Sequence, residues 1–149
     1  MTKIYGERWW NTKNRMVKEM SENEARTIHE SNGCYCMALL EDSVVKYVID
    51  FSSKHVLVRF YEDGLYLSYD FVKTQGKLFL KAAFYYKRDE GKVTETMTFN
   101  FSENGNLYMS KQNMILNETE ERESIVDVTP NWEEIPEFGY YENLIKKER

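Results

Sequence analysis

Two cysteines and two histidines are the side chains in this sequence best suited to binding a metal. Cys34 and Cys36 are one residue apart, and His29 and His55 lie near them in the chain. On an extended strand, side chains two positions apart share a face, so both thiols and two imidazoles would complete a tetrahedral zinc site. The spacing matches none of the common zinc modules, and such cysteines are most often small buried residues. We therefore predict no metal and no cofactor, and two reduced thiols in a cytoplasmic protein.

The sequence carries no catalytic signature. Neither histidine lies in a recognisable serine or cysteine nucleophile motif. The glycines stand singly, whereas a phosphate-binding loop needs several together. The 25 acidic residues allow many carboxylate pairs, but abundance alone does not indicate a pair that performs acid–base catalysis. We expect that the protein is not an enzyme.

An acidic stretch is the most informative candidate for a binding surface. Eight acidic residues and one basic residue, Arg122, lie between Glu118 and Glu137, whereas the rest of the chain has more basic than acidic residues. One interpretation is a solvated face that keeps the protein in solution. The other is a surface that steers a basic partner, with Trp132 and Phe138 as aromatic anchors. The second interpretation predicts these partner-binding residues: Glu118, Glu120, Glu121, Glu123, Asp127, Trp132, Glu133 and Glu134.

Trp9 and Trp10 are a second candidate. Adjacent residues of an extended chain point in different directions, so we expect one tryptophan in the core and the other at an edge or against a partner. The segment from Gly6 to Trp9 resembles the glycine–tryptophan start of lipocalin-like barrels, with one extra residue in the spacing. That resemblance implies an alternative function, a closed barrel that binds a small apolar ligand.

Regular turn signals indicate the elements that would position these residues. Gly64, Gly76, Gly91 and Gly105 each end a short polar cluster between runs rich in β-branched and aromatic residues. Tight hairpins need positive φ, which glycine adopts without strain. We predict an α+β protein, mainly antiparallel β, whose meander over residues 34–116 has about seven or eight strands in a curved sheet or barrel.

Helices are expected at both ends of this meander. Residues 12–32 have a thin apolar stripe, and Ser21 with Glu24 has the spacing of a capping box that would restart a helix. Residues 140–147 would form a short closing helix. The whole chain, 1–149, is expected to be a single domain with three parts, namely a helical segment (12–32), a β-meander (34–116) and an acidic arm with the closing helix (117–149).

Charge and hydropathy exclude some partners. The net charge of −5 disfavours nucleic-acid binding, which normally uses a basic face. No apolar run is long enough to span a bilayer, and the first ten residues lack the apolar segment of an export signal, so we expect no membrane partner and a cytoplasmic location. An unpaired strand edge, such as residues 34–40, would allow a homodimer.

The whole chain resembles the small, acidic, tyrosine- and glutamate-rich immunity proteins of contact-dependent inhibition and other polymorphic toxin systems of bacteria. The turns that end at Gly64 and Gly105 and the acidic run Glu118–Glu123 are in the style of these proteins. The resemblance implies tight association with one cognate toxin, without catalysis or a cofactor. A nuclease toxin would present the basic surface that an acidic inhibitor fits, because its substrate groove must be positive.

Overall fold

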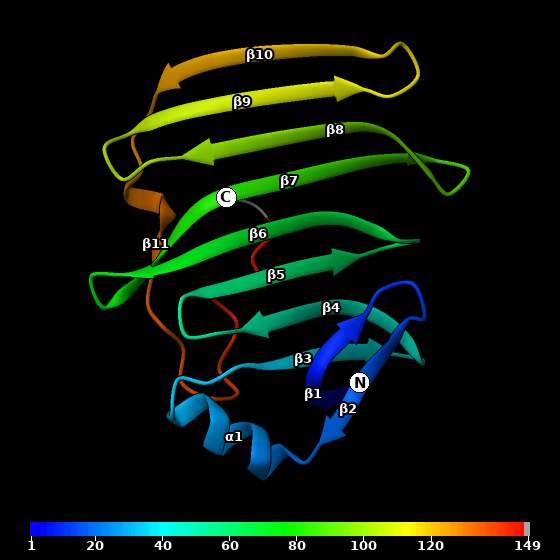
Figure 1. The fold of residues 1–149 in the computed structure, drawn as a ribbon, viewed down its shortest axis with the longest axis vertical. Coiled ribbons are helices and arrows are strands. Elements are labelled where there is room, and N and C mark those ends of the chain that lie inside the picture. The colour runs from blue at the N-terminus through cyan, green and yellow to red at the C-terminus, as the bar shows by residue number, and fades with distance from the viewer. Residues whose placement is uncertain (148–149) are drawn as a thin grey trace.

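A computed structural model describes residues 1–147, which form one large antiparallel sheet and one α-helix (Figure 1). Within these residues the sheet has eleven strands, in the order β10-β9-β8-β7-β6-β5-β4-β3-β1-β2, and the short β11 pairs with β7. No helix in this part of the chain is long and apolar enough to cross a membrane. The elements are β1 (Thr2–Trp10), β2 (Arg15–Met20), α1 (Glu22–Glu30), β3 (Tyr35–Glu41), β4 (Val44–Phe51), β5 (His55–Tyr61), β6 (Leu65–Thr74), β7 (Lys77–Asp89), β8 (Lys92–Phe101), β9 (Asn106–Asn113), β10 (Glu118–Ile125), the 3₁₀ turn η1 (Thr129–Asn131) and β11 (Trp132–Glu133).

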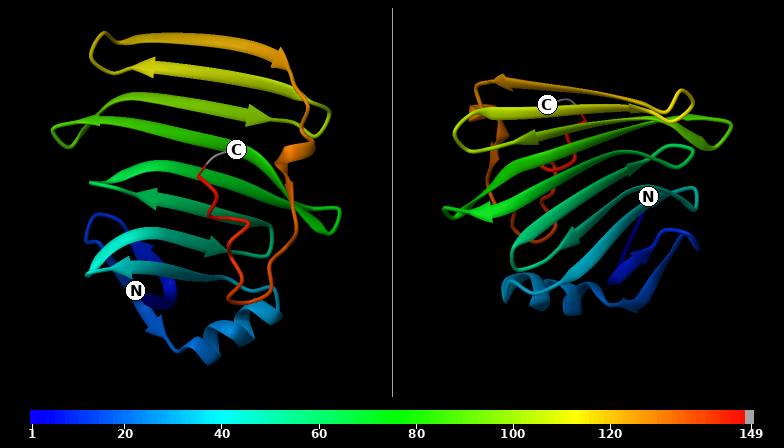
Figure 2. Two further views of the ribbon diagram at one scale, coloured as in Figure 1. Left: turned by 180° about the vertical axis from the view of Figure 1, so that it is seen from behind. Right: turned by 45° about the horizontal axis from the view of Figure 1, so that its top comes forward.

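The predicted antiparallel meander is confirmed, but the strand number and the barrel are wrong. Strands β3 to β10 follow one another in the sheet as they do in the chain. The sheet is curved and open, with β2 and β10 at its two ends (Figure 2). The predicted homodimer edge at residues 34–40 is closed, because β3 pairs with β1 on one side and β4 on the other.

The predicted glycine turns connect the strands of the meander. Gln75 with Gly76 and Glu90 with Gly91 form two-residue loops in which both residues have positive φ. This is the backbone of the turn type whose twist matches that of the flanking strands. Local sequence therefore decides where β6, β7 and β8 begin and end.

The prediction of a helix over residues 12–32 is wrong for its first half. Residues Arg15–Met20 form β2, which pairs with β1, and only Glu22–Glu30 is helical. The capping box is confirmed: the Glu24 N–H donates to Ser21 Oγ at 3.1 Å, and the Ser21 N–H donates to Glu24 Oε1 at 3.3 Å. This capping box begins the helix and does not restart an earlier one, because the preceding residues, Arg15–Met20, form β2 and pair with β1.

The predicted closing helix at residues 140–147 is also absent. After β10 the chain forms η1 and β11 and then crosses one face of the sheet as irregular chain, seen from behind in Figure 2. We call residues 126–147 the C-terminal segment. Pro130, Pro136 and Gly139, which has a φ of 90°, interrupt the chain before residue 140. Between residues 140 and 147 only a single turn forms, in which the Leu144 and Ile145 N–H groups donate to Tyr141 O.

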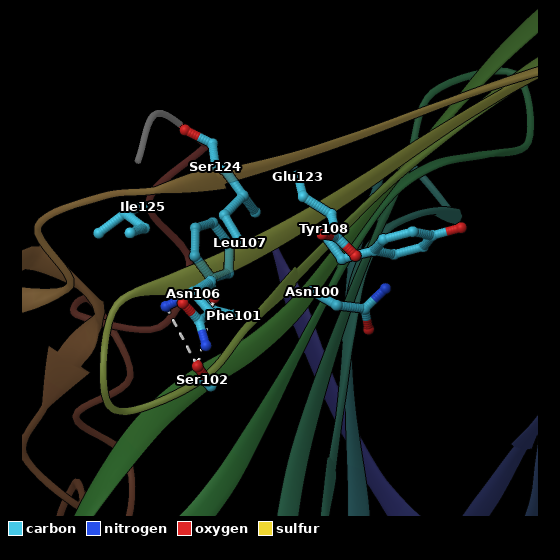
Figure 3. A pocket seen from close by; sticks show the side chains of 9 residues that line it. All are labelled: Asn100, Phe101, Ser102, Asn106, Leu107, Tyr108, Glu123, Ser124 and Ile125. Carbon is cyan, nitrogen blue, oxygen red and sulfur yellow. Dashed lines mark hydrogen bonds between the residues drawn. The ribbon is translucent and has the colours of Figure 1, made fainter.

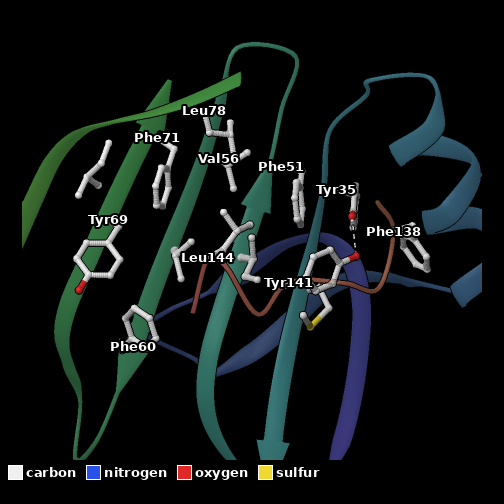
Figure 4. Packing of buried hydrophobic residues seen from close by; sticks show 14 of the residues in the cluster. Tyr35, Phe51, Val56, Phe60, Tyr69, Phe71, Leu78, Phe138, Tyr141 and Leu144 are labelled. Carbon is white, nitrogen blue, oxygen red and sulfur yellow. Dashed lines mark hydrogen bonds between the residues drawn. The ribbon is translucent and has the colours of Figure 1, made fainter. Parts of the chain in front are cut away.

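The main core lies between the sheet and the C-terminal segment. Leu144 is fully buried, and Phe138 and Tyr141 pack with it among aromatic side chains of β3 to β6 (Figure 4). The Tyr35 and Phe51 rings stack at 4.7 Å, and the Tyr141 ring lies 5.3 Å from Phe51. Full burial of a leucine side chain stabilises a fold by about 2 kcal/mol, so these contacts hold an irregular segment against the sheet.

The opposite face of β3 to β5 is covered by the β1–β2 hairpin. Trp9 packs there with Cys36, Val48 and Tyr61, whereas Trp10 is 41% exposed. This confirms that one tryptophan lies in the core and the other does not. Strands β3 to β5 are therefore covered by a hairpin on one face and by an irregular segment on the other.

Candidate protein-binding edge at β10

The four glutamates of the acidic run lie on β10, the last strand of the sheet. Within residues 1–147, β10 pairs only with β9, over its whole length from Glu118 to Ile125 and without a shift in register. Every residue of β10 is exposed. Its eight residues include Glu118, Glu120, Glu121 and Glu123 and one basic residue, Arg122, so a negatively charged strand forms one edge of the molecule.

The hydrogen-bond pattern shows which backbone groups of β10 are open. In an antiparallel ladder, alternate residues bond to the same neighbouring strand. The Met114 N–H donates to Thr94 O at 2.8 Å, so even-numbered residues of β9 bond to β8. The Val126 N–H donates to Gly105 O at 2.8 Å, so odd-numbered residues of β9 bond to β10. Consequently the even-numbered residues of β10 bond to β9. The N–H and C=O groups that face outward belong to Thr119, Glu121, Glu123 and Ile125.

The same four residues place their side chains on one face, which we call the outer face. Glu123, Tyr108 and Asn100 form a row across β10, β9 and β8. They line a shallow hollow of about 720 Å³ near the β8–β9 turn (Figure 3). The Glu121 carboxylate hydrogen-bonds to the Tyr108 phenol and raises the pKa of that phenol. The outer face beside β10 is therefore polar and acidic.

Exposed apolar side chains stand at both ends of β10. The β9–β10 turn carries Ile115 and Leu116, which are 73% and 63% exposed, and Ile125 at the other end is 82% exposed. The turn is ordered, because Asn113 Oδ1 accepts hydrogen bonds from the N–H groups of Ile115 and Leu116, both at 3.0 Å. None of these turn residues is among the predicted partner-binding residues. The signal was present, since an apolar Met-Ile-Leu run sits where a polar turn is usual.

The other predicted partner-binding residues do not share this edge. Asp127 is exposed just after β10, and Thr129 donates hydrogen bonds from its hydroxyl and backbone N–H that lower the pKa of the Asp127 carboxyl. Trp132 and Glu133 lie on β11, which pairs with Phe79 and Leu78 of β7 and, in the described residues, does not pair with β10. The Trp132 ring packs 4.9 Å from Phe79.

The charges next to β11 are paired within the molecule. Glu133 Oε1 lies 3.5 Å from Lys146 Nζ, and Glu134 Oε1 lies 3.3 Å from Lys77 Nζ. Phe138 is buried in the main core and thus is not available as an aromatic anchor for a partner. The acidic stretch is therefore divided into two parts. Its first part is the exposed acidic strand β10, and its second part belongs to the C-terminal segment that packs against the sheet.

The four candidate metal ligands are not brought together. Cys36 is buried beneath the β1–β2 hairpin, and burial raises the pKa of its thiol. His29 faces the other side of the sheet, where its ring nitrogens contact Tyr35 and Pro136. The Nδ1 atom of His55 lies 3.3 Å from Asp70 Oδ1, so this histidine contacts a carboxylate of β6. Within residues 1–147, no group of three or more His, Cys, Asp or Glu side chains is placed to hold a metal ion.

A groove of about 310 Å³ lies between the C-terminal segment and β6 to β9. Its walls include Tyr69, Leu80, Phe99 and Pro130. Cavities that bind small molecules measure about 300–1,000 Å³ and enclose most of the ligand. This groove is at the lower limit and lies on an open sheet, so the geometry favours the β10 edge as the functional site.

The function of this edge has to be inferred from its own chemistry. Comparisons of the chain with models of known protein families, with curated proteins and with solved structures found no match.

Proposed function

We propose that this chain is a non-catalytic binding protein that neutralises a cognate bacterial toxin by tight association, and that the toxin domain presents a basic surface, as a nuclease does. The observation that carries the proposal is the β10 edge, where a fully exposed strand holds four glutamates and one arginine. Charges on a rigid edge strand are held at fixed spacing. Such an edge attracts a basic partner and repels an acidic one.

The charge distribution supports a surface of this kind over a merely solvated one. Salt bridges pair Glu133 and Glu134 with lysines, whereas the only basic residue on β10 is Arg122. Clustered charge of one sign raises the rate at which an oppositely charged partner is captured. A nuclease groove must be positive to hold its substrate, so an acidic edge is complementary to the site that an inhibitor has to block.

The apolar residues at the ends of β10 support tight binding. Rim charges mainly increase association rates, whereas apolar side chains buried at an interface slow dissociation. Ile115, Leu116 and Ile125 are exposed, ordered and close to the acidic strand. We propose them as the anchors for the partner, in place of the predicted Trp132 and Phe138.

The test is rescue of bacterial growth. A toxin domain encoded beside this gene is expressed in a bacterial host together with the chain. We expect the wild-type chain to restore growth. The triple variant Glu120→Lys, Glu121→Lys and Glu123→Lys should fail, because each substitution replaces an attraction with a repulsion, and affinity should fall by about a hundredfold or more.

The matched control reverses three exposed glutamates away from β10, namely Glu19→Lys, Glu30→Lys and Glu41→Lys. It has the same net charge as the first variant, and we expect it to rescue growth. Rescue by the β10 triple variant would contradict the proposed surface, and failure of the wild-type chain to rescue would contradict the proposed function.

A further inference from the structure

We propose that β10 binds its partner as a β-strand, so that an extended basic segment of the partner is added to the open edge of the sheet. The inference deepens the proposed function, on which it rests for the identity of the partner. It concerns backbone hydrogen bonds, which charge complementarity alone does not require. In strand addition, main-chain bonds supply affinity and alternate side chains supply specificity.

The two edges of the sheet differ in their capacity to accept a strand. At the β2 edge, Lys18 has a φ of 51°, and the pairing between β1 and β2 is interrupted at Glu7 and Lys18. Irregular backbone of this kind protects an edge from further pairing. β10 has eight continuously paired residues, no residue with positive φ and no proline. Its backbone is therefore regular enough to template another strand.

The charge of β10 decides which strand it accepts. A second copy of β10 would bring two net-negative strands together, and like charges on neighbouring strands are destabilising. A basic strand meets no such barrier. Charge therefore protects this edge from self-association while leaving it open to a partner of opposite charge.

The register specifies the side chains expected in the partner. Thr119, Glu121, Glu123 and Ile125 have outward-facing backbone groups and side chains on the outer face. On the inner face, Arg122 of β10 accompanies Glu118 and Glu120, so the negative charge of that face is partly balanced within the strand. The larger net negative charge lies on the outer face, at Glu121 and Glu123. The partner strand should therefore carry Lys or Arg at alternate positions, directed to the outer face.

The experiment measures amide hydrogen exchange by NMR in the full ¹⁵N-labelled chain. The probe is a short synthetic peptide with blocked ends in which lysine alternates with threonine or valine, added at about millimolar concentration. We expect exchange of the Thr119, Glu121, Glu123 and Ile125 amides to slow by about tenfold or more, because these groups gain hydrogen bonds. The even-numbered amides of β10 already bond to β9 and should change little. No toxin is needed, so this test and the rescue test can fail independently.

Two controls separate strand addition from attraction between charges. The same peptide with an N-methyl group on every residue keeps its charge but loses the donors along both edges, and it should give no protection. In the chain, Glu121→Pro removes an outward N–H and should abolish protection, whereas Glu121→Gln removes only the charge and should weaken it. Thermal unfolding checks that both variants are folded.

Three outcomes with the peptides would overturn the inference. They are equal effects of the methylated and unmethylated peptides, protection that does not alternate along β10, and no protection at millimolar peptide. Alternating protection that rises with the concentration of the chain alone would also overturn it, because a second copy would then be the occupant.

Discussion

At the scale of single residues, a short hydrogen-bonded chain connects the sheet, the helix and the C-terminal segment. His29 Nε2 lies 2.9 Å from Pro136 O, which can only accept, so Nε2 carries the proton of the neutral ring. Nδ1 then accepts from the Tyr35 hydroxyl at 2.7 Å. The Tyr35 oxygen is therefore left to accept from the Tyr141 hydroxyl at 3.0 Å, the contact drawn in Figure 4. Three elements thus depend on one neutral imidazole.

This arrangement predicts that stability falls in acid. Burial is the main cause that lowers the pKa of His29 below its ordinary value of 6.5, and Lys73 adds to the effect while Pro136 O and Glu30 oppose it. The unfolded chain therefore binds the proton more readily. The stability that His29 contributes is complete above that ordinary pKa and is lost as the pH falls through the folded-state value.

The check is urea denaturation of wild-type protein and of His29→Gln between about pH 8 and pH 5. The wild-type free energy of unfolding should decrease more steeply with falling pH than that of the variant. Parallel curves would show that His29 is not responsible.

At the scale of elements, the glycine turns look alike in sequence but differ in their surroundings. Gly91 has a φ of 80°, and a Cβ atom added there would meet nothing within 4 Å. Gly105 has a φ of 97°, and a Cβ atom would lie 2.7 Å from Val126 O. Gly105 O also accepts the Val126 N–H, so this turn is tied to the start of the C-terminal segment.

Alanine substitutions should separate these two cases. Gly91→Ala should lower the free energy of unfolding by about 1 kcal/mol, the usual effect of a side chain at positive φ. Gly105→Ala should lower it by about 2 kcal/mol or more, because the Val126 carbonyl must also move. Chemical denaturation of the two variants measures the difference. Equal losses would show that the contact with Val126 contributes nothing.

At the scale of the whole molecule, most of the sheet is packed, and the strand at one end, β10, is bare. β3 to β5 are covered by the hairpin on one face and by the C-terminal segment on the other. β10 is exposed throughout and carries four glutamates. It lies at the end of the sheet furthest from β2 (Figure 1). The molecule therefore has a rigid body and a charged edge, an arrangement suited to long-range steering.

The steering predicts a salt-dependent association. Raising sodium chloride from about 50 mM to about 500 mM should lower the association rate constant with the toxin domain by about tenfold or more, because the added ions screen the glutamates. The dissociation rate constant should change less, since it depends mainly on the apolar contacts at Ile115 and Leu116. Stopped-flow fluorescence measures both rates. An association rate constant independent of salt would contradict the prediction.

The turns and the helix start could be predicted because their causes are local. A glycine at Gly76 or Gly91 permits positive φ wherever the chain runs, and the Ser21–Glu24 box needs only the residues between them. The sequence by itself therefore determined an antiparallel meander. It also located the four glutamates that β10 carries, although their place at an edge was not visible in the sequence.

What only the tertiary structure decided depends on contacts between distant residues. Residues 15–20 have a weak helical pattern but pair with β1, and residues 140–147 lie across the sheet because Leu144 is buried there. Pairing with β7 takes Glu133 away from the acidic run, and within residues 1–147 no strand lies beyond β10, so the outward backbone groups of Glu121 and Glu123 are unpaired. Local propensity amounts to a few tenths of a kcal/mol per residue, whereas strand pairing and burial contribute more, so the long-range contacts prevail.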